Sequence, residues 1–343
     1  MRATRFHWWE AVLCLAVTLA VTLVCVCVGS VALPLRETSG ILLGALRGET
    51  LESASASILL RVRLPRVLAV ALIGASLSLC GASMQGLLRN PLADGSTLGV
   101  SSGASLGAAV AIVTGFTLPG LPIPGTAVMA MVFAFAALVA ILSLSYALDS
   151  GLSTQTILLF GVVFSMLVTS LLSLLIAFSG EKLRSITFWT MGSLSGVGYP
   201  SVGLLLAALL LGGGVLLSQA TALNAFTMGE TRALHLGIPV RRVKLTVMIT
   251  VSALVGVCVS VGGGIGFVGL ATPHMVRFLS GPNHKRLLPY SVFGGAVFLL
   301  LCDLAARTAL APVELPIGVV TSLIGAGVFF MIYIRSRKRR RHP

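Results

Sequence analysis

Three observations predict an all-α integral membrane protein with ten transmembrane helices: an apolar composition, ten apolar segments of suitable length, and basic residues gathered on one side. Of the 343 residues, 56% are hydrophobic and 10% are charged, against about 25% charged residues in a soluble domain. With a mean hydropathy of +1.02, the chain is neither a water-soluble globule nor disordered. Six cysteines are too few for a disulfide scaffold.

Ten segments meet or approach the roughly 20 apolar residues of a transmembrane helix. The first is longer than the roughly 7–15 apolar residues of a signal peptide, so we expect it to be retained as a helix. The eighth is short and contains Pro273, His274 and Arg277, so it spans the membrane only if neighbouring helices cover it. The predicted helices cover residues 11–33, 66–86, 96–114, 126–148, 154–178, 199–219, 243–263, 270–280, 290–311 and 317–334.

The basic residues predict the orientation of these helices. With ten helices both termini lie on one side, whose loops carry 16 of the 24 Lys and Arg residues. An excess of Lys and Arg marks the cytoplasmic face, so both termini are predicted to be cytoplasmic. The tail RSRKRRRH (335–342) directly follows the last helix, which favours an anchor to anionic lipid over a nucleic-acid-binding arm.

The ten helices divide into two five-helix halves within one transmembrane domain (1–343). Because each half has an odd number of helices, the halves are inverted relative to each other. The two weak segments, 96–114 and 270–280, are the third of each half, and interrupted segments at matching positions indicate the transport path. Gly99, Gly103 and Gly107 recur every four residues, which predicts one small-residue stripe for close helix packing.

No motif predicts that this chain performs covalent chemistry. The ATP-binding P-loop pattern and the HExxH zinc pattern are absent from the sequence. The pattern G-x-S-x-G surrounds Ser101 and Ser105, but inside a membrane helix rather than at a strand-to-helix turn. An intramembrane serine hydrolase with His274 as its base is one alternative. An ion-coupled transporter is another, for which Asp303 is the one candidate carboxylate.

Charged residues near the outer face predict either a structural pair or a docking surface. Asp303 and Arg307 are four residues apart and on one helix face, so Arg307 either pairs only with Asp303 or also faces an outside partner. Arg61, Arg63 and Arg66 are three cations within six residues. They are solvated or snorkelling arginines, or they form a surface that binds an acidic partner, which is the interpretation we favour.

The cytoplasmic segment 222–240, ALNAFTMGETRALHLGIPV, predicts a short helical pair. Met228-Gly229-Glu230 opens a helical pattern, and Gly237 and Pro239 close it. The segment is long for an ordinary connection between helices. We therefore interpret it as a lever moved by a soluble motor protein.

Several segments, taken together, resemble one known family. RLPRVLAVALIGASLSLCGASMQGLLRNPLADGSTLGVSSGASLG (63–107), GETRALHLG (229–237), GIGFVGLATPHMVRFLSG (264–281) and ELPIGVVTSLIGAGVFF (314–330) are the longest. With NHKRLLP (283–289) and GAVFLLLCDLAAR (295–307), they resemble, in order, the permease subunits of type II ABC importers for iron siderophores, haem or cobalamin (FecCD/BtuC-like). The resemblance spans residues 60 to 334.

The resemblance implies a bacterial inner-membrane homodimer, or a pair with a close paralogue, with the path at the dimer interface. It also implies two cytoplasmic ABC ATPase subunits that bind ATP and Mg²⁺, an extracytoplasmic binding protein, and no cofactor, metal or nucleic acid on this chain. An iron chelate is the expected cargo and cobalamin the alternative. By resemblance, the binding protein docks on Arg63, Arg66 and Arg307, the ATPase contacts Gly229, Glu230, Ala233, Leu236 and Gly237, and the cytoplasmic gate comprises Asn90, Leu92, Ser153 and Thr154.

Two positions depart from the family pattern. Gly95 in NPLADG and Gly327 in GAGVF stand where the family usually has proline. Glycine lacks the fixed φ angle of proline, so both replacements are expected to loosen a helix end without changing the family assignment.

Overall fold

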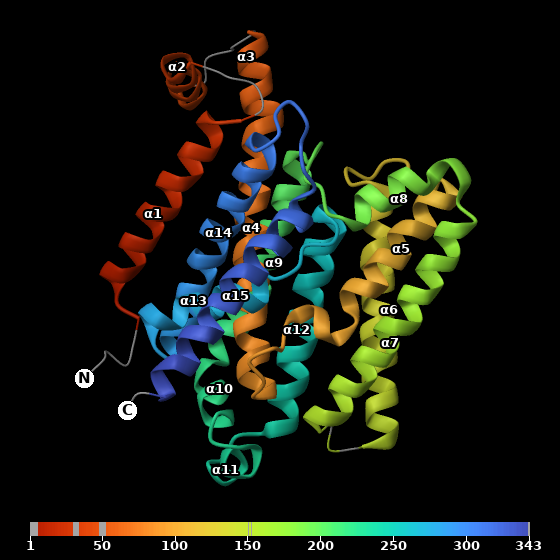
Figure 1. Ribbon diagram of the computed structural model, residues 1–343, viewed down its shortest axis with the longest axis vertical. Coiled ribbons are helices and arrows are strands. Elements are labelled where there is room, and N and C mark those ends of the chain that lie inside the picture. Colours follow the sequence, from red (N-terminus) through yellow and green to blue (C-terminus); the bar gives the residue numbers. More distant parts are fainter. Residues whose placement is uncertain (1–5, 30–33, 48–52, 150, 152, 342–343) are drawn as a thin grey trace.

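The computed structural model describes residues 6–29, 34–47, 53–149, 151 and 153–341, and the described residues contain helices and loops but no strand. Ten helices of the described residues correspond, in order, to the ten predicted segments (Figure 1). They are α1 (Trp8–Cys27), α4 (Leu64–Leu88), α5 (Val100–Thr114), α6 (Gly125–Leu148), α7 (Thr154–Ala177), α9 (Tyr199–Ser218), α12 (Val240–Gly262), α13 (Val268–Ser280), α14 (His284–Thr308) and α15 (Ile317–Arg341).

Shorter elements occupy the connections. Residues 54–88 form one continuous helical rod, because α3 (Ala54–Ser57) and a π-helical turn (Ile58–Arg63) lead directly into α4. The remaining short elements are α2 (Leu35–Leu46), α8 (Leu183–Thr190), α10 (Ala220–Phe226), α11 (Glu230–His235) and two 3₁₀ turns, Gly95–Leu98 and Gly180–Lys182.

The helix lengths confirm a multi-pass membrane protein. Within the described residues, seven helices are long and apolar enough to cross a bilayer by themselves. The other three predicted spans are α5, α13 and α15, of which α15 is apolar over 317–331. At about 1.5 Å per residue, α5 and α13 reach only about 22 and about 20 Å, short of the roughly 30 Å hydrocarbon core. The two predicted weak segments are therefore the short ones in the structure.

Three boundaries differ most from the sequence prediction, and one of them is the start of α14, at His284 instead of residue 290. The first helix was expected over 11–33, but α1 ends at Cys27 and residues 30–33 lie outside the described part. The polar stretch after it forms α2, which the apolar-length criterion cannot detect. The last helix continues from Ile317 to Arg341, so the basic tail extends the helix, and Gly327 lies inside it rather than at a loosened end.

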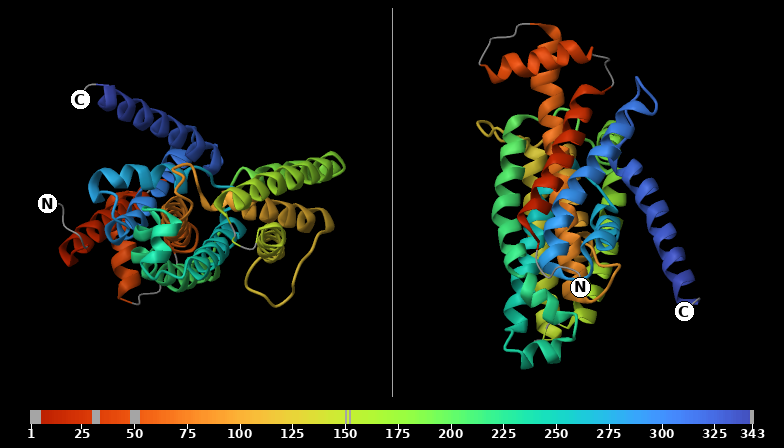
Figure 2. Two further views of the ribbon diagram at one scale, coloured as in Figure 1. Left: turned by 90° about the horizontal axis from the view of Figure 1, so that it is seen from below. Right: turned by 90° about the vertical axis from the view of Figure 1, so that its left-hand side faces the viewer.

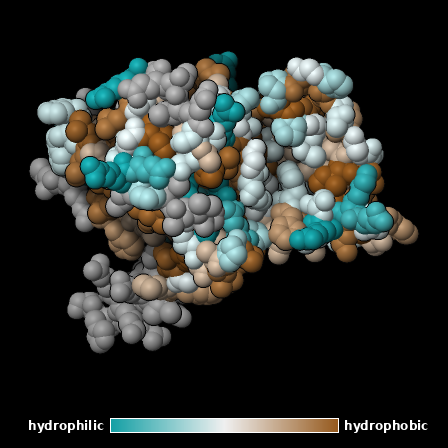
Figure 3. All heavy atoms as spheres, turned by 90° about the horizontal axis from the view of Figure 1, so that it is seen from above, coloured by the Kyte–Doolittle hydropathy of each residue, from teal (hydrophilic) through white to brown (hydrophobic). Residues whose placement is uncertain are grey.

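The described ends of the chain lie at the same end of the bundle. α1 begins and α15 ends toward the end that carries α11, while α2, α3 and α8 lie at the opposite end (Figures 1 and 2). The predicted orientation places α11 in the cytoplasm and α2, α3 and α8 outside. Figure 3 looks onto this outer end, where polar residues are scattered among apolar ones.

α4 is the central helix, and glycines allow its neighbours to approach closely. It packs along α14, where Gly74 meets Gly295, and against the start of α13, where Gly81 faces the carbonyl oxygen of Gly269. A Cβ atom on any of these glycines would overlap the backbone of the partner helix. Membrane helices associate through such small residues, so α4 has no room for larger side chains at these positions.

We expect Gly81→Ala to lower the thermal stability of the purified protein strongly. Its new methyl group would overlap the backbone of α13, which cannot rotate away, and overpacking of this kind costs about 1–3 kcal/mol. The matched control is Gly214→Ala on the membrane helix α9, because a Cβ atom added there would have no atom within 4 Å. Unfolding midpoints in detergent, followed by aggregation, check this prediction, and equal midpoints for both variants would contradict it.

The glycine stripe of the third segment is confirmed in part. Gly103 and Gly107 face α6, because Cβ atoms there would overlap the backbone oxygens of Phe133 and Met129. Gly99 precedes α5 and adopts a left-handed conformation with φ of 70°, so it ends the 3₁₀ turn instead of joining the stripe. The helix starts later than the spacing predicted.

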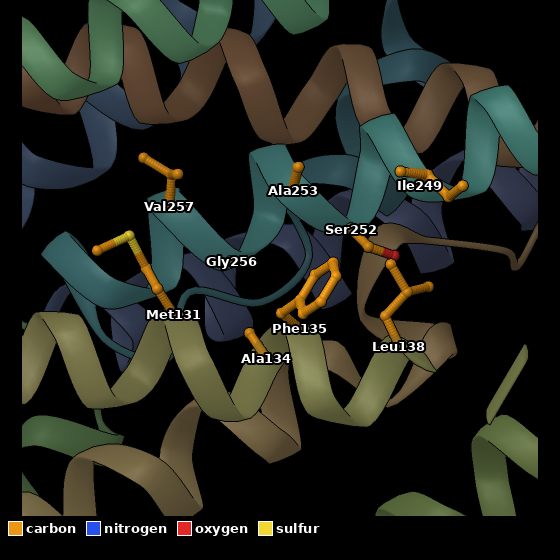
Figure 4. A pocket seen from close by; sticks show the side chains of 9 residues that line it. All are labelled: Met131, Ala134, Phe135, Leu138, Ile249, Ser252, Ala253, Gly256 and Val257. Carbon is orange, nitrogen blue, oxygen red and sulfur yellow. The ribbon is translucent and has the colours of Figure 1, made fainter. Parts of the chain in front are cut away.

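A small cavity between α6 and α12 does not suit the expected cargo. Its volume is about 200 Å³, below the roughly 300–1,000 Å³ of small-molecule sites. Apolar side chains such as Met131, Phe135 and Val257 surround it, with Ser252 as the polar member (Figure 4). A bulky metal chelate therefore needs a different route.

Candidate transport and coupling sites

The three arginines predicted to dock a partner lie together at the outer end of α4 and α14. Arg66 and Arg307 share the carboxylate of Asp303, with Nε–Oδ distances of 3.1 and 2.8 Å. The Arg63 guanidinium donates to the carbonyl oxygens of Val26 and Cys27 at the end of α1. Arg307 donates to further carbonyls there, those of Cys25 and Val28. The cluster therefore ties the end of α1 to α4 and α14.

Glu314 completes this outer cluster at its solvent side. Arg66 Nη1 donates to Glu314 Oε2 at 2.7 Å, and the Ser195 hydroxyl donates to the same oxygen at 3.3 Å. Although desolvation raises the pKa of the Glu314 carboxyl, the hydrogen bond and charge of Arg66 outweigh it and lower the pKa below its usual value. Glu314 is therefore ionised at neutral pH and its bond to Arg66 persists.

The structure brings the predicted docking residues together but buries them. Arg63, Arg66 and Arg307 are only 5%, 9% and 3% exposed, and each has internal partners. The pair of Asp303 and Arg307 predicted from their spacing is confirmed. Arg61, from the same predicted group, is exposed. Docking by the three arginines stays a prediction, and it requires the partner to reach them past Glu314.

At the opposite end, segment 222–240 forms the predicted pair of short helices, α10 and α11. Gly229 joins them with φ of 110° and ψ of 149°, a conformation that is essentially restricted to glycine. Gly237 closes α11 with φ of 78°, and Ile238 and Gly237 donate to the carbonyls of Ala233 and Leu234. These bonds form a Schellman motif, so both glycines shape the turn.

The surface of this helix pair carries apolar side chains outside the membrane-spanning segments. Met228, Leu234 and Leu236 are exposed, whereas Ala233 is fully buried. Exposed apolar side chains outside the membrane-spanning segments are candidates for contact with another protein. The predicted coupling residues therefore divide into Ala233, which packs inside, and Leu236, which faces outward.

Glu230 links α11 to two other helices. Its Oε2 accepts from Lys244 Nζ at 2.7 Å, and its Oε1 accepts from the Thr154 hydroxyl at 3.3 Å. Lys244, on the first turns of α12, is fully buried, and Thr154 is the first residue of α7. A predicted coupling residue thus contacts a predicted gate residue directly, whereas the sequence prediction treats the two as separate sites.

The start of α7 is shaped by capping bonds. Ser153 is the N-cap residue, and its side chain accepts from the Thr156 backbone N–H. Asp149 Oδ2 accepts from the Ser153 N–H at 2.9 Å, and this bond lowers the pKa of the Asp149 carboxyl. Such caps satisfy N–H groups that have no partner within the helix, so the position of Thr154 is well defined.

The second predicted gate segment is the loop between α4 and α5. Arg89 ends α4 in a left-handed conformation with φ of 51°, which turns the chain sharply. The Asn90 side chain then accepts from the Leu92 N–H at 2.9 Å, while Leu92 is exposed. Asp94 caps the 3₁₀ turn that follows, and burial raises the pKa of its carboxyl despite this bond.

One cleft of about 810 Å³ borders the end of α4, the predicted gate residue Thr154 and the coupling helix, whereas Asn90 and Leu92 do not line it. It places the end of α4 and the start of α7 opposite α11. Its walls contain both polar and apolar side chains, and its volume lies within the range of small-molecule sites. The lining residues are Leu88, Arg89, Thr154, Gln155, Met228, Gly229, Glu230, Thr231 and Arg232.

The structure does not bring together the residues of a serine hydrolase. The Ser105 hydroxyl donates to the carbonyl of Ser101 within α5. The His274 Nε2 atom lies 3.0 Å from the carbonyl oxygen of Pro91, so the proposed base contacts backbone instead of a serine. Within the described residues, no group of three or more His, Cys, Asp or Glu side chains could hold a metal ion.

Packing explains why glycine stands at position 95, where the family usually has proline. Gly95 is capped by Asp94, and a Cβ atom there would press on the Val255 side chain of α12. At Gly327, by contrast, an added Cβ atom would have no atom within 4 Å. The expected loosening of a helix end is therefore wrong at Gly327, which lies inside α15, while Gly95 begins an ordered turn.

Sequence reasoning missed several residues that complete these clusters. Lys244, Glu314 and Ser195 did not enter any predicted site, although the first two are charged residues at the ends of apolar segments. A further buried ion pair joins Glu10 of α1 to Arg286 of α14, and Tyr290 donates to Glu10 at 2.9 Å. A signal existed for the charged residues, because an ionisable residue inside or beside a membrane segment needs a partner; no such signal marked Ser195.

Comparison with known proteins identifies the relatives of this chain. Residues 17–335 match the family model described as the FecCD transport family. The chain is 41% identical over 81% of its length, and 73% of the relative, to the cobalamin import system permease protein BtuC of Halobacterium salinarum. It is 38% identical, over 82% of its length and 84% of the relative, to the hemin transport system permease protein HmuU of Yersinia pestis.

A solved structure has the same fold. An inward-facing metal-chelate type ABC transporter superposes with a TM-score of 0.82 and 31% sequence identity, over 94% of this chain and 97% of that one. The apolar helices and these relatives make the protein a multi-pass component of the bacterial inner membrane. Because the family model matches nearly the whole sequence, this chain belongs to the FecCD transport family, whose members are transport permeases.

Proposed function

We propose that this chain is the membrane-spanning permease subunit of an ATP-driven importer that carries an iron chelate, a ferric siderophore or haem, into the cytoplasm. One observation carries the proposal: Glu230 of the cytoplasmic helix pair bonds both Lys244 and Thr154 at the start of α7. A movement of α10 and α11 is thereby transmitted to the predicted gate. The metal-chelate and hemin names of the two relatives support the cargo class.

The proposal assigns the energy source to other subunits. Two cytoplasmic ABC ATPases bind ATP and Mg²⁺ and cover the exposed Met228, Leu234 and Leu236. A second copy of this chain, or a close paralogue, packs against the exposed apolar faces of α7 and α15, where residues such as Met166 and Leu323 point outward. The substrate path then lies between the two copies, which agrees with the small cavity inside one copy.

An extracytoplasmic binding protein delivers the chelate at the outer end. Its acidic residues approach the cluster of Arg63, Arg66 and Arg307. Closure of the two ATPases on ATP moves α11, and through Glu230 the start of α7. The path then opens alternately to the outside and to the cytoplasm. The chain supplies the walls and gates of the path and no resident cofactor or metal.

Cobalamin is the alternative cargo. The 41% identity to a cobalamin import permease is slightly higher than the 38% to the hemin permease. Both cargoes are large chelates that arrive with the metal already bound, so the transport machinery is the same. The choice between them depends on the side chains that line the assembled dimer path.

Uptake measurements decide the cargo. Cells that carry the intact gene, and cells that lack it, are offered labelled ferric siderophores, haem and cobalamin side by side. The proposal expects gene-dependent uptake of an iron chelate that persists when the proton gradient is collapsed while ATP is maintained. Gene-dependent uptake of cobalamin alone would mean that cobalamin, and not an iron chelate, is the cargo. Uptake that is lost with the proton gradient would refute the ATP-driven mechanism.

We expect Glu314→Gln to strengthen docking of the cognate binding protein. Glu314 occupies Arg66 from within the same chain, so it competes with any carboxylate that a partner brings to this arginine. A neutral amide competes less well, because charged hydrogen bonds are roughly twice as strong as neutral ones. We expect a dissociation constant about threefold to tenfold lower than for the unaltered protein, measured by surface-immobilised binding at low salt.

The control for docking is Glu37→Gln, which removes an exposed carboxylate on α2 at the same end. This variant changes the net charge by the same amount without freeing Arg66, so a comparable gain in affinity would indicate a general charge effect. An unchanged or weaker affinity of Glu314→Gln would refute docking on Arg66.

A further inference from the structure

A histidine of α13, the short third segment of the second half, contacts the loop that precedes the short third segment of the first half. His274 lies on α13, and its Nε2 atom is 3.0 Å from the carbonyl oxygen of Pro91, in the loop that leads to α5. A carbonyl oxygen only accepts hydrogen bonds, so Nε2 must carry a proton and donate. We call residues 90–94 the α4–α5 loop. The contact joins this loop of the first half to α13 of the second half.

The same loop makes a second close contact with α13, through Asp94. Gly269, on the first turn of α13, faces Asp94 so closely that a Cβ atom would overlap the Asp94 carboxylate. Between these contacts, Ala93 is fully buried. The α4–α5 loop is therefore held at both ends by α13, and a release at Pro91 exposes Ala93.

The other side of the His274 ring contacts α15. The rings of His274 and Phe329 meet edge to face, with centroids 5.7 Å apart and an interplanar angle of 73°. Edge-to-face aromatic pairs are favourable and directional. The imidazole thus lies between the α4–α5 loop and α15, a helix on which Leu323 and Phe330 are exposed.

The start of α13 is bound to α4. The Gln85 side chain of α4 donates to the carbonyl oxygens of Gly269 and Leu270 at 3.2 and 3.4 Å, and Gly81 packs against the same turn. From the same helix, His274 contacts both the α4–α5 loop and α15. A displacement of α15 would therefore move the His274 ring and alter its hydrogen bond to Pro91.

We propose that His274 is a positioning residue that latches the α4–α5 loop to α13 and makes release of the loop depend on the position of α15. The inference rests on the proposed function, because Asn90 and Leu92 in this loop form its cytoplasmic gate. It adds a residue to that gate and a physical connection between the gate and the helix at the predicted dimer interface.

Accessibility of the loop tests the latch without any transport measurement. Ala93 is replaced by cysteine in the full-length protein in membranes, and its modification by N-ethylmaleimide is followed by mass spectrometry of the peptide that contains residue 93. In the Ala93→Cys background, His274→Leu is expected to raise the modification rate about fivefold, the effect of losing one hydrogen bond. His274→Gln keeps a donor N–H and is expected to restore the slow rate.

Native Cys302 provides an internal control in the same sample. It is buried in α14 next to Asp303, at the opposite end of the bundle from the α4–α5 loop, so its modification reports general loosening of the bundle. Equal acceleration at residues 302 and 93 would reduce His274 to an ordinary packing residue and overturn the latch. An unchanged rate at residue 93 in His274→Leu, or failure of His274→Gln to restore it, would overturn it as well.

The connection to α15 is tested with neighbouring phenylalanines. Phe329→Ala removes the ring that contacts His274, whereas Phe330→Ala removes an exposed ring on the same turn. We expect faster modification at residue 93 for Phe329→Ala alone. Equal rates for the two variants would refute the connection. Because these rates need no cargo, a failed uptake assay with an intact latch would reject the proposed function and leave the latch standing.

Discussion

Asp303→Asn is expected to reduce the stability of the protein more than any other single change in the outer cluster. Asp303 is fully buried and is the shared carboxylate of Arg66 and Arg307. Its replacement by a neutral amide leaves two buried guanidinium groups with one carboxylate, Glu314, between them. Removing one partner of a buried ion pair costs about 3–5 kcal/mol, so we expect a large drop in the unfolding midpoint and a low yield of folded protein.

A matched variant separates this effect from a general loss of negative charge. Glu37→Gln removes an exposed carboxylate at the same end of the molecule and is expected to change the midpoint little, because exposed charges contribute about 0–1 kcal/mol. The measurement is thermal unfolding in detergent at neutral pH. Similar midpoints for Asp303→Asn and Glu37→Gln would contradict a buried network.

The outer cluster also connects the first helix to the bundle. α1 has an exposed apolar surface along most of its length, and its described contacts with charged side chains of other helices lie near its ends. Arg63 and Arg307 bind carbonyls at its outer end, and Glu10 pairs with Arg286 at its cytoplasmic end. Carbonyls at a helix end lack partners within the helix, so the arginines satisfy groups that would otherwise be unpaired in the membrane.

Local sequence information was sufficient for features whose signal lies within a few consecutive residues. Segment 222–240 was correctly predicted as two short helices because glycine and proline punctuate it. The Asp303–Arg307 pair was predictable because helix geometry places residues four apart on one face. Both signals lie within a few consecutive residues.

The contacts that define the sites join residues distant in sequence. Arg66 is 237 residues from Asp303 and 248 from Glu314, and no periodicity connects such positions. The arginines were predicted to be a docking surface, since three cations near a helix end resemble a solvent-facing patch. Their burial depends on how α1, α4 and α14 pack, which a single sequence does not specify.

Glu230→Ala is expected to impair both stability and transport, for different reasons. Lys244 is fully buried and loses its paired carboxylate. Because the Glu230 side chain is 37% exposed, the cost should fall below the roughly 3–5 kcal/mol of a fully buried pair. The variant also loses the bond to Thr154, so movement of α11 no longer reaches α7. We expect ATP-dependent uptake of the cargo to fall at least tenfold.

The double variant Glu230→Ala, Lys244→Met separates the two effects. It removes both charges, and replacing a buried pair by apolar groups is often neutral for stability. We therefore expect the unfolding midpoint to return close to that of the unaltered protein while uptake stays low, because the link to Thr154 is still missing. Recovery of uptake together with stability would show that Glu230 only neutralises Lys244, and coupling through Glu230 would then be wrong. Glu181→Ala, which removes an exposed carboxylate at the outer side, is expected to leave both measurements unchanged.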